Sequence, residues 1–288
     1  MGRVGIDLYP NQLSTPLREV RTYTRFVGGF AGNASTGLAR LGVQTAIVSR
    51  VGAEGHGEFV RDFLSSEGID VSYLRTDPTW PTPPTFCEVW PPDRFPITFY
   101  RRPTCPDWQL SPEDFDAEIV ADAPLLYATG TGLAQSPSRE TTLVALEAHR
   151  GTTIFDLDWR PTLWEQPEQY PELAWLAASR ADIVIGNEEE VAASELDSVP
   201  LLVLKRGEQG ATVIEDERET HVPGFPVGVV NGLGAGDAFA AALGHGLLRG
   251  YPLVEAVRRG TVAGALVAAQ LACSEAMPTL EQLEEALA

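Results

Sequence analysis

The chain has 288 residues, of which 44% are hydrophobic, and it carries a formal net charge of −19. This length provides a full core for one large α/β domain or for two smaller domains. A surface this acidic repels nucleic acid and anionic membranes, so neither is an expected partner.

Signals for export, membrane insertion and disulfide bonding are missing from the sequence. No run of about 18 apolar residues occurs, so no membrane span is expected. The opening residues MGRVGIDLYP lack the basic and apolar regions of a secretory signal. The cysteines at 87, 105 and 273 show neither zinc-site spacing nor a disulfide pattern. We therefore expect a reduced, cytoplasmic protein.

The first third of the chain mixes strands, helices and a proline-rich segment. Residues 4–8 predict a strand with an acid near its end, and residues 33–41 predict a helix behind a capping Asn33. A buried strand at 45–52 and a helix at 57–68 follow. Nine of the 22 prolines lie between residues 78 and 106, which excludes a helix there. Two alternating runs in this segment, 85–90 and 97–102, predict a β-hairpin.

After residue 120, strands and helices alternate along the chain. Strands are predicted at 124–130, 152–158, 182–187, 200–207 and 210–217, and helices at 138–151, 172–181, after the glycines of 232–236, and at 253–272. This alternation indicates a mostly parallel sheet covered by helices on both faces. Ligands bind such sheets at the carboxyl ends of the strands. The residues predicted near those ends are Asp7, Asp156, Asp158, Asn187 and residues 234–237.

The segment NGLGAGDAF, residues 231–239, places three glycines at alternate positions before an acid and an apolar helix. It has no Walker A lysine, and its third glycine comes one residue too early for a dinucleotide fingerprint. Gly234, Ala235 and Gly236 at a helix N-terminus offer free N–H groups that can hold an anion. Asp237 either complements the helix dipole and caps the turn or takes the proton of an acceptor hydroxyl in phosphoryl transfer.

Taken together, the motifs VGIDLYP, FVGGFAGNAS, IGNEEE, LKRGEQGATV and NGLGAGDAF resemble the ribokinase (PfkB) family of sugar kinases over essentially the whole chain. The resemblance implies a ribokinase-like α/β fold, a three-layer α/β/α sandwich with a mostly parallel sheet. It implies a single domain over residues 1–288 with a small β-sheet lid from segments 8–27 and 82–104. Closing such a lid would exclude water from the reaction. Phe86, Val89 and Phe99 on the lid predict a homodimer formed by pairing of two lids.

The resemblance also assigns roles around the acceptor sugar. Asp237 would be the catalytic base, and Gly234, Ala235 and Gly236 would form the anion hole. Asp7 and Asn33 would bind sugar hydroxyls, with Gly28 and Gly29 as the hinge of the lid. From the residues alone, Asp7 also fits a solvent-facing strand end, Asn33 a helix cap and the glycine pair an ordinary turn.

A second group of residues would serve ATP and Mg²⁺. Asn187 and Glu190 would organise the water shell of Mg²⁺, although an Asn with a Glu three residues later is also a capping box. The resemblance places Lys205, Gly207 and Gly210 in a nucleotide-side loop, where KRGEQG alone is a Gly-bearing turn. Thr261 stands where many relatives have Asn near the adenine. Asn231-Gly232-Leu233 replaces the usual Asp-Thr-Thr, which puts a monovalent-cation site in doubt.

Three arginines, Arg101, Arg102 and Arg160, are candidates for binding an acidic sugar, because a carboxylate needs a guanidinium or a similar donor. Each of them also fits pairing with surface acids, and Asp158 is expected to hold Arg160. Strand alternation would point Arg101 and Arg102 to opposite faces, so only one is expected to contact substrate.

The stretches PTFCEVWPPDRFPITFYRRP, FDLDWRPTLW and CSEAMPT are most similar to family members that act on a sugar acid of inositol breakdown. We therefore expect an ATP-dependent kinase that phosphorylates the terminal hydroxyl of a sugar acid. The alternatives are a kinase for 2-keto-3-deoxygluconate, fructose or a nucleoside, and a non-catalytic sugar or nucleotide sensor on the same fold.

Overall fold

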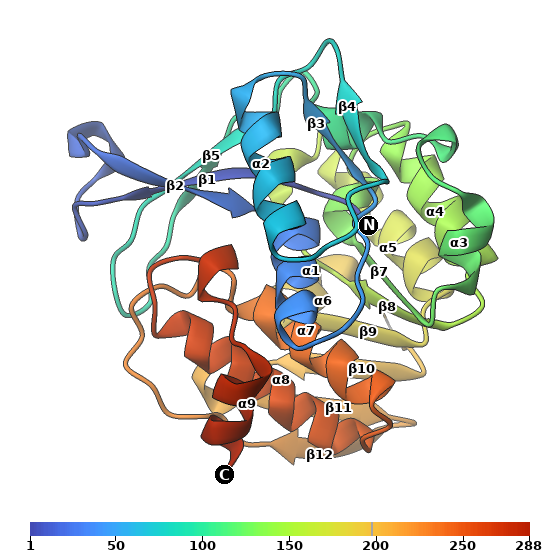
Figure 1. Cartoon of the computed structure of the whole chain (residues 1–288). Coiled ribbons are helices and arrows are strands. Elements are labelled where there is room, and N and C mark those ends of the chain that lie inside the picture. Colours follow the sequence, from blue (N-terminus) through green and yellow to red (C-terminus); the bar gives the residue numbers. More distant parts are fainter. Residues whose placement is uncertain (197) are drawn as a thin grey trace.

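The main sheet of the computed structural model, which describes residues 1–196 and 198–288, has six strands in the order β12–β11–β10–β9–β8–β7 (Figure 1). Four strands run parallel: β7 (Leu125–Thr129), β8 (Thr152–Asp156), β9 (Ile183–Asn187) and β10 (Leu201–Lys205). β11 (Ala211–Glu215) and β12 (Arg218–Val222) complete one edge as an antiparallel pair. The predicted mostly parallel sheet is confirmed.

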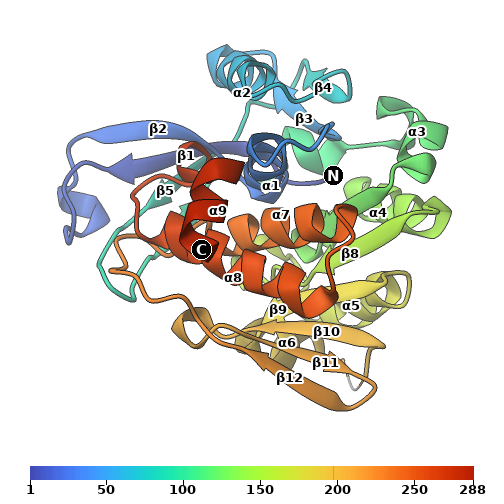
Figure 2. The ribbon, with the colours of Figure 1, turned by 60° about the horizontal axis from the view of Figure 1, so that its bottom comes forward.

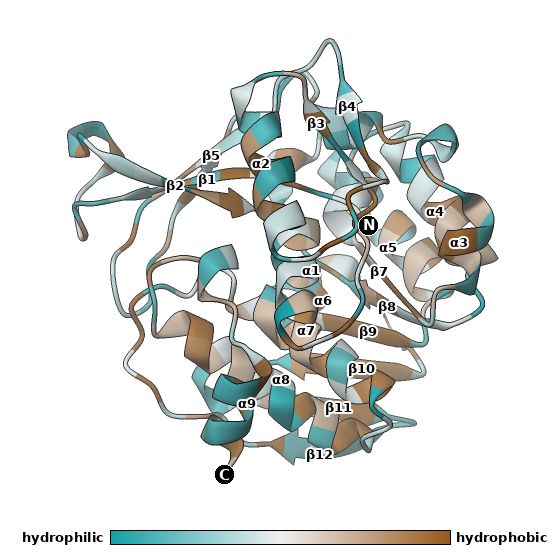
Figure 3. Ribbon diagram, in the orientation of Figure 1, coloured by the Kyte–Doolittle hydropathy of each residue, from teal (hydrophilic) through white to brown (hydrophobic). Residues whose placement is uncertain are grey.

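Helices cover both faces of this sheet, because successive strand residues point to opposite sides. In β8, Ile154 packs with α1 (Phe30–Arg40), α7 (Ala235–Leu248) and α8 (Leu253–Ala268). Its neighbour Phe155 packs on the other side, where α3 (Ala117–Asp122), α4 (Ser138–Ala148), α5 (Tyr170–Ala178) and α6 (Glu188–Ser194) lie. Figure 2 shows α7 and α8 side by side over the sheet. The central strand β9 is hydrophobic and the edge strand β12 hydrophilic (Figure 3).

A separate four-stranded sheet extends from one side of the body (Figure 1). Its order is β2–β1–β5–β6, with β1 at Gly5–Pro10, β2 at Tyr23–Gly28, β5 at Pro84–Cys87 and β6 at Ile97–Phe99. β1 pairs antiparallel with β2 and parallel with β5, and β5 and β6 form the predicted hairpin. The first strand of the sequence therefore lies inside the small sheet. We call this sheet the lid sheet.

The remaining elements flank these two sheets. β3 (Ser49–Gly52) and β4 (Leu74–Asp77) pair in parallel, and α2 (Gly55–Ser66) packs against them and β1. α9 (Leu280–Leu287), which the sequence analysis did not predict, packs against α8. Within the described residues, no helix is both long and apolar enough to cross a membrane.

Two local expectations are wrong. The helix predicted from Asn33 begins three residues earlier, at Phe30, and its N-cap is Gly29 with a φ of 87°. Asn33 is therefore inside the first turns of α1 and is not its cap. On the lid sheet, Val89 is fully buried in a cluster with Tyr9, so it is not part of an exposed apolar face.

Candidate active site

The acids and glycines predicted at strand ends meet in one cavity of about 330 Å³. It lies between the lid sheet and the carboxyl ends of the parallel strands, where a doubly wound sheet binds its ligands. The predicted residues that line it are Asp7, Gly29, Asn33, Asp156, Asp158, Arg160, Asn187, Glu190, Lys205, Gly207, Gly234, Gly236 and Asp237. Arg3, Tyr9, Cys87, Phe99 and Cys273 also line the cavity.

Asp237 lies in the first turn of α7, and its Oδ2 accepts a hydrogen bond of 2.7 Å from Asn33 Nδ2. The N-cap of α7 is Gly234, with a φ of 83°, and no side chain caps this helix. A Cβ at Gly234 would lie 2.9 Å from Cys273 Cβ and Sγ, so only glycine fits this turn without a shift. Desolvation raises the pKa of Asp237, although the Asn33 bond acts in the opposite direction. The Ala235 N–H donates to the Gly232 carbonyl at 3.4 Å and Ala235 does not line this cavity, whereas Gly234 and Gly236 do. A carboxylate with a raised pKa at this helix start is well placed to accept a proton.

Asp7 lies across the cavity on β1. Burial raises its pKa to about 6, with Asp237 acting in the same direction and Arg3 against it. A Cβ on Gly28 would lie 2.2 Å from the Asp7 carboxyl carbon, so the absence of a side chain there lets this carboxyl group pack against β2. Asn33 Oδ1 is buried and has no hydrogen-bond partner within the described chain. These side chains leave polar atoms for sugar hydroxyls.

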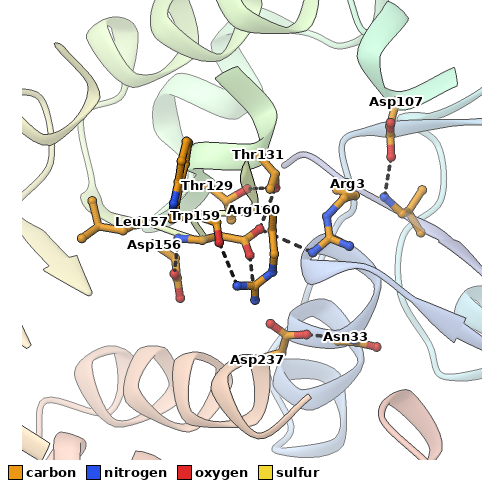
Figure 4. Close-up of polar contacts among 12 residues, drawn as sticks. Arg3, Asn33, Asp107, Thr129, Thr131, Asp156, Leu157, Trp159, Arg160 and Asp237 are labelled. Carbon is orange, nitrogen blue, oxygen red and sulfur yellow. Dashed lines mark hydrogen bonds and ion pairs between the residues drawn. The ribbon is translucent and has the colours of Figure 1, made fainter. Parts of the chain in front are cut away.

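Asp158, two residues beyond the end of β8, joins Arg3 and Arg160. Figure 4 labels both arginines. Asp158 Oδ1 lies 3.1 Å from Arg160 Nη2 and Asp158 Oδ2 lies 3.4 Å from Arg3 Nη2, so the expected Asp158–Arg160 pair is confirmed. Oδ2 also accepts a hydrogen bond of 2.6 Å from the Thr131 hydroxyl. Burial would raise the pKa of Asp158, but Arg160 and Arg3 hold it below its ordinary value.

Lys205, the last residue of β10, pairs with Asp156 at the end of β8 and with Glu190 in α6. Its Nζ lies 2.9 Å from Asp156 Oδ2 and 3.9 Å from Glu190 Oε2. Burial raises the pKa of Asp156 to about 7 even though Lys205 opposes that shift. Burial disfavours the charged form of Lys205, but the two carboxylates raise its pKa above its ordinary value. The ammonium group is therefore a fixed positive charge in the cavity wall.

Asn187 and Glu190 form the capping box at the start of α6. Asn187 Oδ1 accepts from the Glu190 N–H, and Glu190 Oε2 accepts from the Asn187 N–H, both at 2.8 Å. Glu190 Oε1 also accepts from Arg160 Nη1 at 3.3 Å. The capping role is confirmed, and both side chains line the cavity as well.

A second cavity, of about 710 Å³, adjoins the first. Its lining includes Gly207, Gly210, Phe225, Thr261 and Gly264. Lys205, Gly207, Gly232 and Gly236 line both cavities. The glycine loop before α7 therefore stands between a polar chamber and a larger neighbouring chamber.

Comparisons with known proteins identify this arrangement. A family profile described as pfkB family carbohydrate kinase matches residues 1–280. The chain belongs to this family. The kinase is 35% identical to a 5-dehydro-2-deoxygluconokinase of Geobacillus thermodenitrificans and 34% identical to one of Clostridium tetani, in each case over 99% of this chain and 91% of the relative.

Solved structures bear out the ribokinase-like fold. An uncharacterized sugar kinase from Pyrococcus horikoshii, also solved in complex with ATP, superposes with a TM-score of 0.88 at 27% identity, covering 100% of this chain and 98% of that one. A fructokinase from Vibrio cholerae, bound to fructose, ADP and calcium ion, gives 0.86 at 26% identity, covering 100% and 97%. The protein is an ATP-dependent carbohydrate kinase.

The side-chain oxygens of Asn187 and Glu190 are of the type that binds the water molecules around Mg²⁺. Within the described residues, no group of three or more Asp, Glu, His or Cys side chains could hold a metal directly. Glu190 and Asn187 offer a carboxylate and an amide oxygen that already bind protein donors. Mg²⁺ prefers oxygen ligands and keeps several waters. This donor set suits a metal held mainly by water and phosphate.

Arg101 and Arg102 do not lie in the strand in which they were expected. β6 ends at Phe99, so strand alternation does not reach residues 101 and 102. Arg101 is only 3% exposed, pairs with Asp107 and lies over the Trp108 ring at 4.9 Å. Arg102 is exposed and donates to the Trp164 carbonyl at 3.3 Å. Neither residue lines the cavity of about 330 Å³ that holds Asp7 and Asp237, so the expected substrate contact is wrong for both.

Arg3 is the cavity arginine that the sequence analysis missed. A usable signal exists, because residues 3, 5 and 7 share one side of an extended chain. Arg3 therefore lies on the same side as Asp7, and Gly5 between them has no side chain.

Proposed function

We propose that the kinase transfers the γ-phosphoryl group of ATP to the terminal hydroxyl of a sugar acid. We propose 5-dehydro-2-deoxygluconate as the substrate, which would give the enzyme a role in inositol catabolism. The names of the relatives at 34–35% identity support this substrate. The observation that carries the proposal is the Asp237 carboxylate, bound to Asn33 and facing a cavity that also holds arginines.

In the proposed reaction, Asp237 accepts the proton of the acceptor hydroxyl. The hydroxyl oxygen bonds to the γ-phosphorus while the bond from that phosphorus to the β–γ bridging oxygen breaks, and ADP leaves. The N–H groups of Gly234, Ala235 and Gly236 stabilise charge on the transferred group. Lys205, which faces both cavities, contributes a positive charge between sugar and nucleotide.

Asn187 and Glu190 are proposed to hold Mg²⁺ through water. When bound, Mg²⁺ neutralises charge on the phosphate oxygens. Gly207, Gly210 and Thr261 line the larger cavity, which we assign to the nucleoside part of ATP. The replacement of Asp-Thr-Thr by residues 231–233 remains an argument against a monovalent-cation requirement.

We also propose that the lid sheet closes over the sugar. Its strands overlap the segments expected for a lid, 8–27 and 82–104, although β1 begins at Gly5. Six residues of its strands line the cavity: Asp7, Tyr9, Thr85, Cys87, Ile97 and Phe99. Gly28 and Gly29 lie where β2 meets α1, which is the connection at which a hinge would act. A closed lid would keep water away from the γ-phosphate.

The test is ADP release from MgATP with a panel of acceptors: 5-dehydro-2-deoxygluconate, 2-keto-3-deoxygluconate, fructose and a nucleoside. We expect the highest kcat/KM for 5-dehydro-2-deoxygluconate. A higher value for any of the other three would contradict the substrate assignment and identify the acceptor. ADP release that ignores every sugar would contradict the proposed reaction itself.

A further inference from the structure

We propose that Arg3 determines the specificity of this kinase for an anionic sugar, by binding the substrate carboxylate with guanidinium donors that the protein leaves free. The inference rests on the proposed sugar-acid kinase function. It names a residue for which neither the resemblance nor the comparisons supply a role.

The first argument is the set of unused donors on Arg3. A guanidinium carries five N–H donors, and within the described chain Asp158, at 3.4 Å, is the one side-chain acceptor that Arg3 binds. Arg3 Nε is buried and has no hydrogen-bond partner there. The side chain is only 12% exposed, so water reaches little of it. A buried charged donor without a partner is costly, and a bound carboxylate would supply the missing acceptor.

The other cations of the cavity, Arg160 and Lys205, are already engaged; Figure 4 shows Arg160. Arg160 Nη1 donates to the Trp159 carbonyl at 3.0 Å and to Glu190 at 3.3 Å, and its Nη2 pairs with Asp158 at 3.1 Å. Lys205 pairs with Asp156 at 2.9 Å. Among the cationic side chains that line this cavity, Arg3 has the weakest attachment to protein and the most free donors.

The contact that Arg3 does make can be exchanged without leaving an unpaired charge. Asp158 keeps Arg160 and the Thr131 hydroxyl as partners if Arg3 moves to a substrate carboxylate. The ability of Arg3 to leave Asp158 for a substrate matters because the lining of this cavity contains five acids that repel a carboxylate: Asp7, Asp156, Asp158, Glu190 and Asp237. An anionic sugar needs a directed cation to enter such a field.

The position of Arg3 also suits a sugar that extends to the catalytic base. Its guanidinium lies over the ring of Phe99 in the lid sheet, 5.6 Å from the ring centre. Arg3, Asp7 and Asp237 line the same cavity, and the positive charge of Arg3 opposes the burial that raises the pKa of both carboxyls. A sugar acid held by Arg3 at one end would therefore have its hydroxyls between these two acids.

A buried ion pair fixes the backbone beside Arg3. Asp107 Oδ2 accepts from the Val4 N–H at 2.8 Å, while its Oδ1 pairs with Arg101. Arg101 and Asp107 are 3% and 2% exposed. Arg101 therefore reaches the cavity only indirectly, through Asp107 and the backbone beside Arg3.

The test compares Arg3→Gln and Arg3→Lys with a matched control, Arg102→Gln, which removes a nearby arginine outside the cavity. Initial rates are measured for 5-dehydro-2-deoxygluconate and for fructose. We expect Arg3→Gln to raise KM for the acid by roughly 10- to 100-fold, as for a lost charge-assisted hydrogen bond. KM for fructose should change less than about threefold. Arg3→Lys should fall between wild type and Arg3→Gln, and Arg102→Gln should match wild type.

The outcomes separate this inference from the proposed function. A wild-type enzyme that prefers the acid, together with an unchanged KM in Arg3→Gln, would overturn the Arg3 assignment alone. Equal losses for the acid and for fructose would mean that Arg3 acts only through structure, which also overturns it. A wild type without preference for the acid would remove the sugar-acid proposal and the Arg3 assignment with it. If Arg3→Gln fails to fold, the same comparison is made with Arg3→Lys, which keeps the charge but loses the guanidinium fork.

Discussion

At the scale of single residues, Asp237 carries the proton transfer on which the proposed reaction depends. Asp237→Asn keeps an oxygen that can accept from Asn33, so the fold and nucleotide binding should be preserved. Loss of the base should lower kcat by roughly 10²- to 10⁴-fold. Steady-state kinetics measure the loss, and calorimetric titration with ATP checks that the nucleotide still binds. A variant within a few-fold of wild-type turnover would remove Asp237 from the mechanism.

The raised pKa of Asp7 predicts how the free energy of unfolding depends on pH. Burial raises its pKa from 3.8 to about 6, so the folded chain holds this proton more tightly than the unfolded chain does. The stability that comes from protonated Asp7 is complete below about pH 4 and is lost as the pH rises through about 6. Asp7→Asn cannot ionise, so it should raise the free energy of unfolding by about 2–3 kcal/mol at pH 8 and change it little at pH 4.

Urea unfolding of wild type and Asp7→Asn at these two pH values measures the effect. The control is Asp62→Asn on the exposed side of α2, which should leave stability unchanged at both. Asp7→Asn should also lose sugar-dependent activity, since Asp7 is a proposed substrate ligand. A destabilisation by Asp7→Asn that is larger at pH 8 than at pH 4 would show that the Asp7 carboxylate is stabilising in its charged form, which would contradict the raised pKa.

At the scale of one element, a substitution at the start of α6 can distinguish a capping role of Glu190 from a role in holding Mg²⁺. Gln can replace Glu at the third position of a capping box, so Glu190→Gln should keep α6. The variant removes the charge that faces Arg160 and Lys205, so the melting temperature should fall. The neutral amide is a poorer acceptor for Mg²⁺-bound water, so more Mg²⁺ should be needed for half-maximal activity. The control is Glu189→Gln on the exposed side of the same turn. A lower melting temperature with an unchanged Mg²⁺ response would leave Glu190 as a cap alone.

The elements also explain which parts of the fold could be predicted from sequence. Strands β7 to β10 are continuous apolar runs separated by helices, and local pattern is enough to find them. β1 could not be placed, because its partners β2 and β5 are distant in sequence and pairing is set by tertiary contacts. The start of α1 depends on Gly29 at positive φ, which hydrophobic periodicity does not reveal.

The candidate site also depends on contacts between distant segments, which local sequence pattern does not reveal. Asp237, Asn33 and Asp7 come from segments far apart in the chain, and the resemblance to a family was needed to group them before the structure placed them in one cavity. Arg101 was misassigned because the end of β6 at Phe99 decides where its side chain goes. Arg3 was missed because it precedes its strand, although it shares a side with Asp7.

At the scale of the whole molecule, two cavities meet at the glycine loop before α7. Lys205 and Gly236 line both, so one loop and one cation serve the proposed sugar and nucleotide chambers. The net charge of −19 means that two anionic substrates approach an acidic protein. Local cations, and the proposed Mg²⁺, would offset the overall field at the site itself, because that field opposes the binding of anions.

The predicted homodimer keeps Phe86 of the three lid residues first expected, and Tyr23 and Tyr100 join it. Phe99 lines the cavity, whereas Phe86 packs edge to face with Tyr23 and Tyr100, at ring-centre distances of 5.3 and 5.4 Å. Tyr100 is 58% exposed, an unusual degree for a residue in an aromatic cluster. A second lid sheet packed over these rings would cover them, and the interface would tie lid movement in one subunit to the other.

We therefore expect wild type to sediment as a dimer and Tyr100→Glu to sediment as a monomer, because the new carboxylate would be buried without a partner in the interface. The control is Trp175→Glu, which changes an aromatic residue that is 56% exposed on α5, away from the lid sheet. It should remain a dimer. Sedimentation velocity distinguishes the states, and a dimeric Tyr100→Glu would place the interface elsewhere. If pairing also steadies the lid over the sugar, the monomeric variant should show a raised KM for the sugar and an unchanged KM for ATP, whose proposed cavity does not include Tyr100.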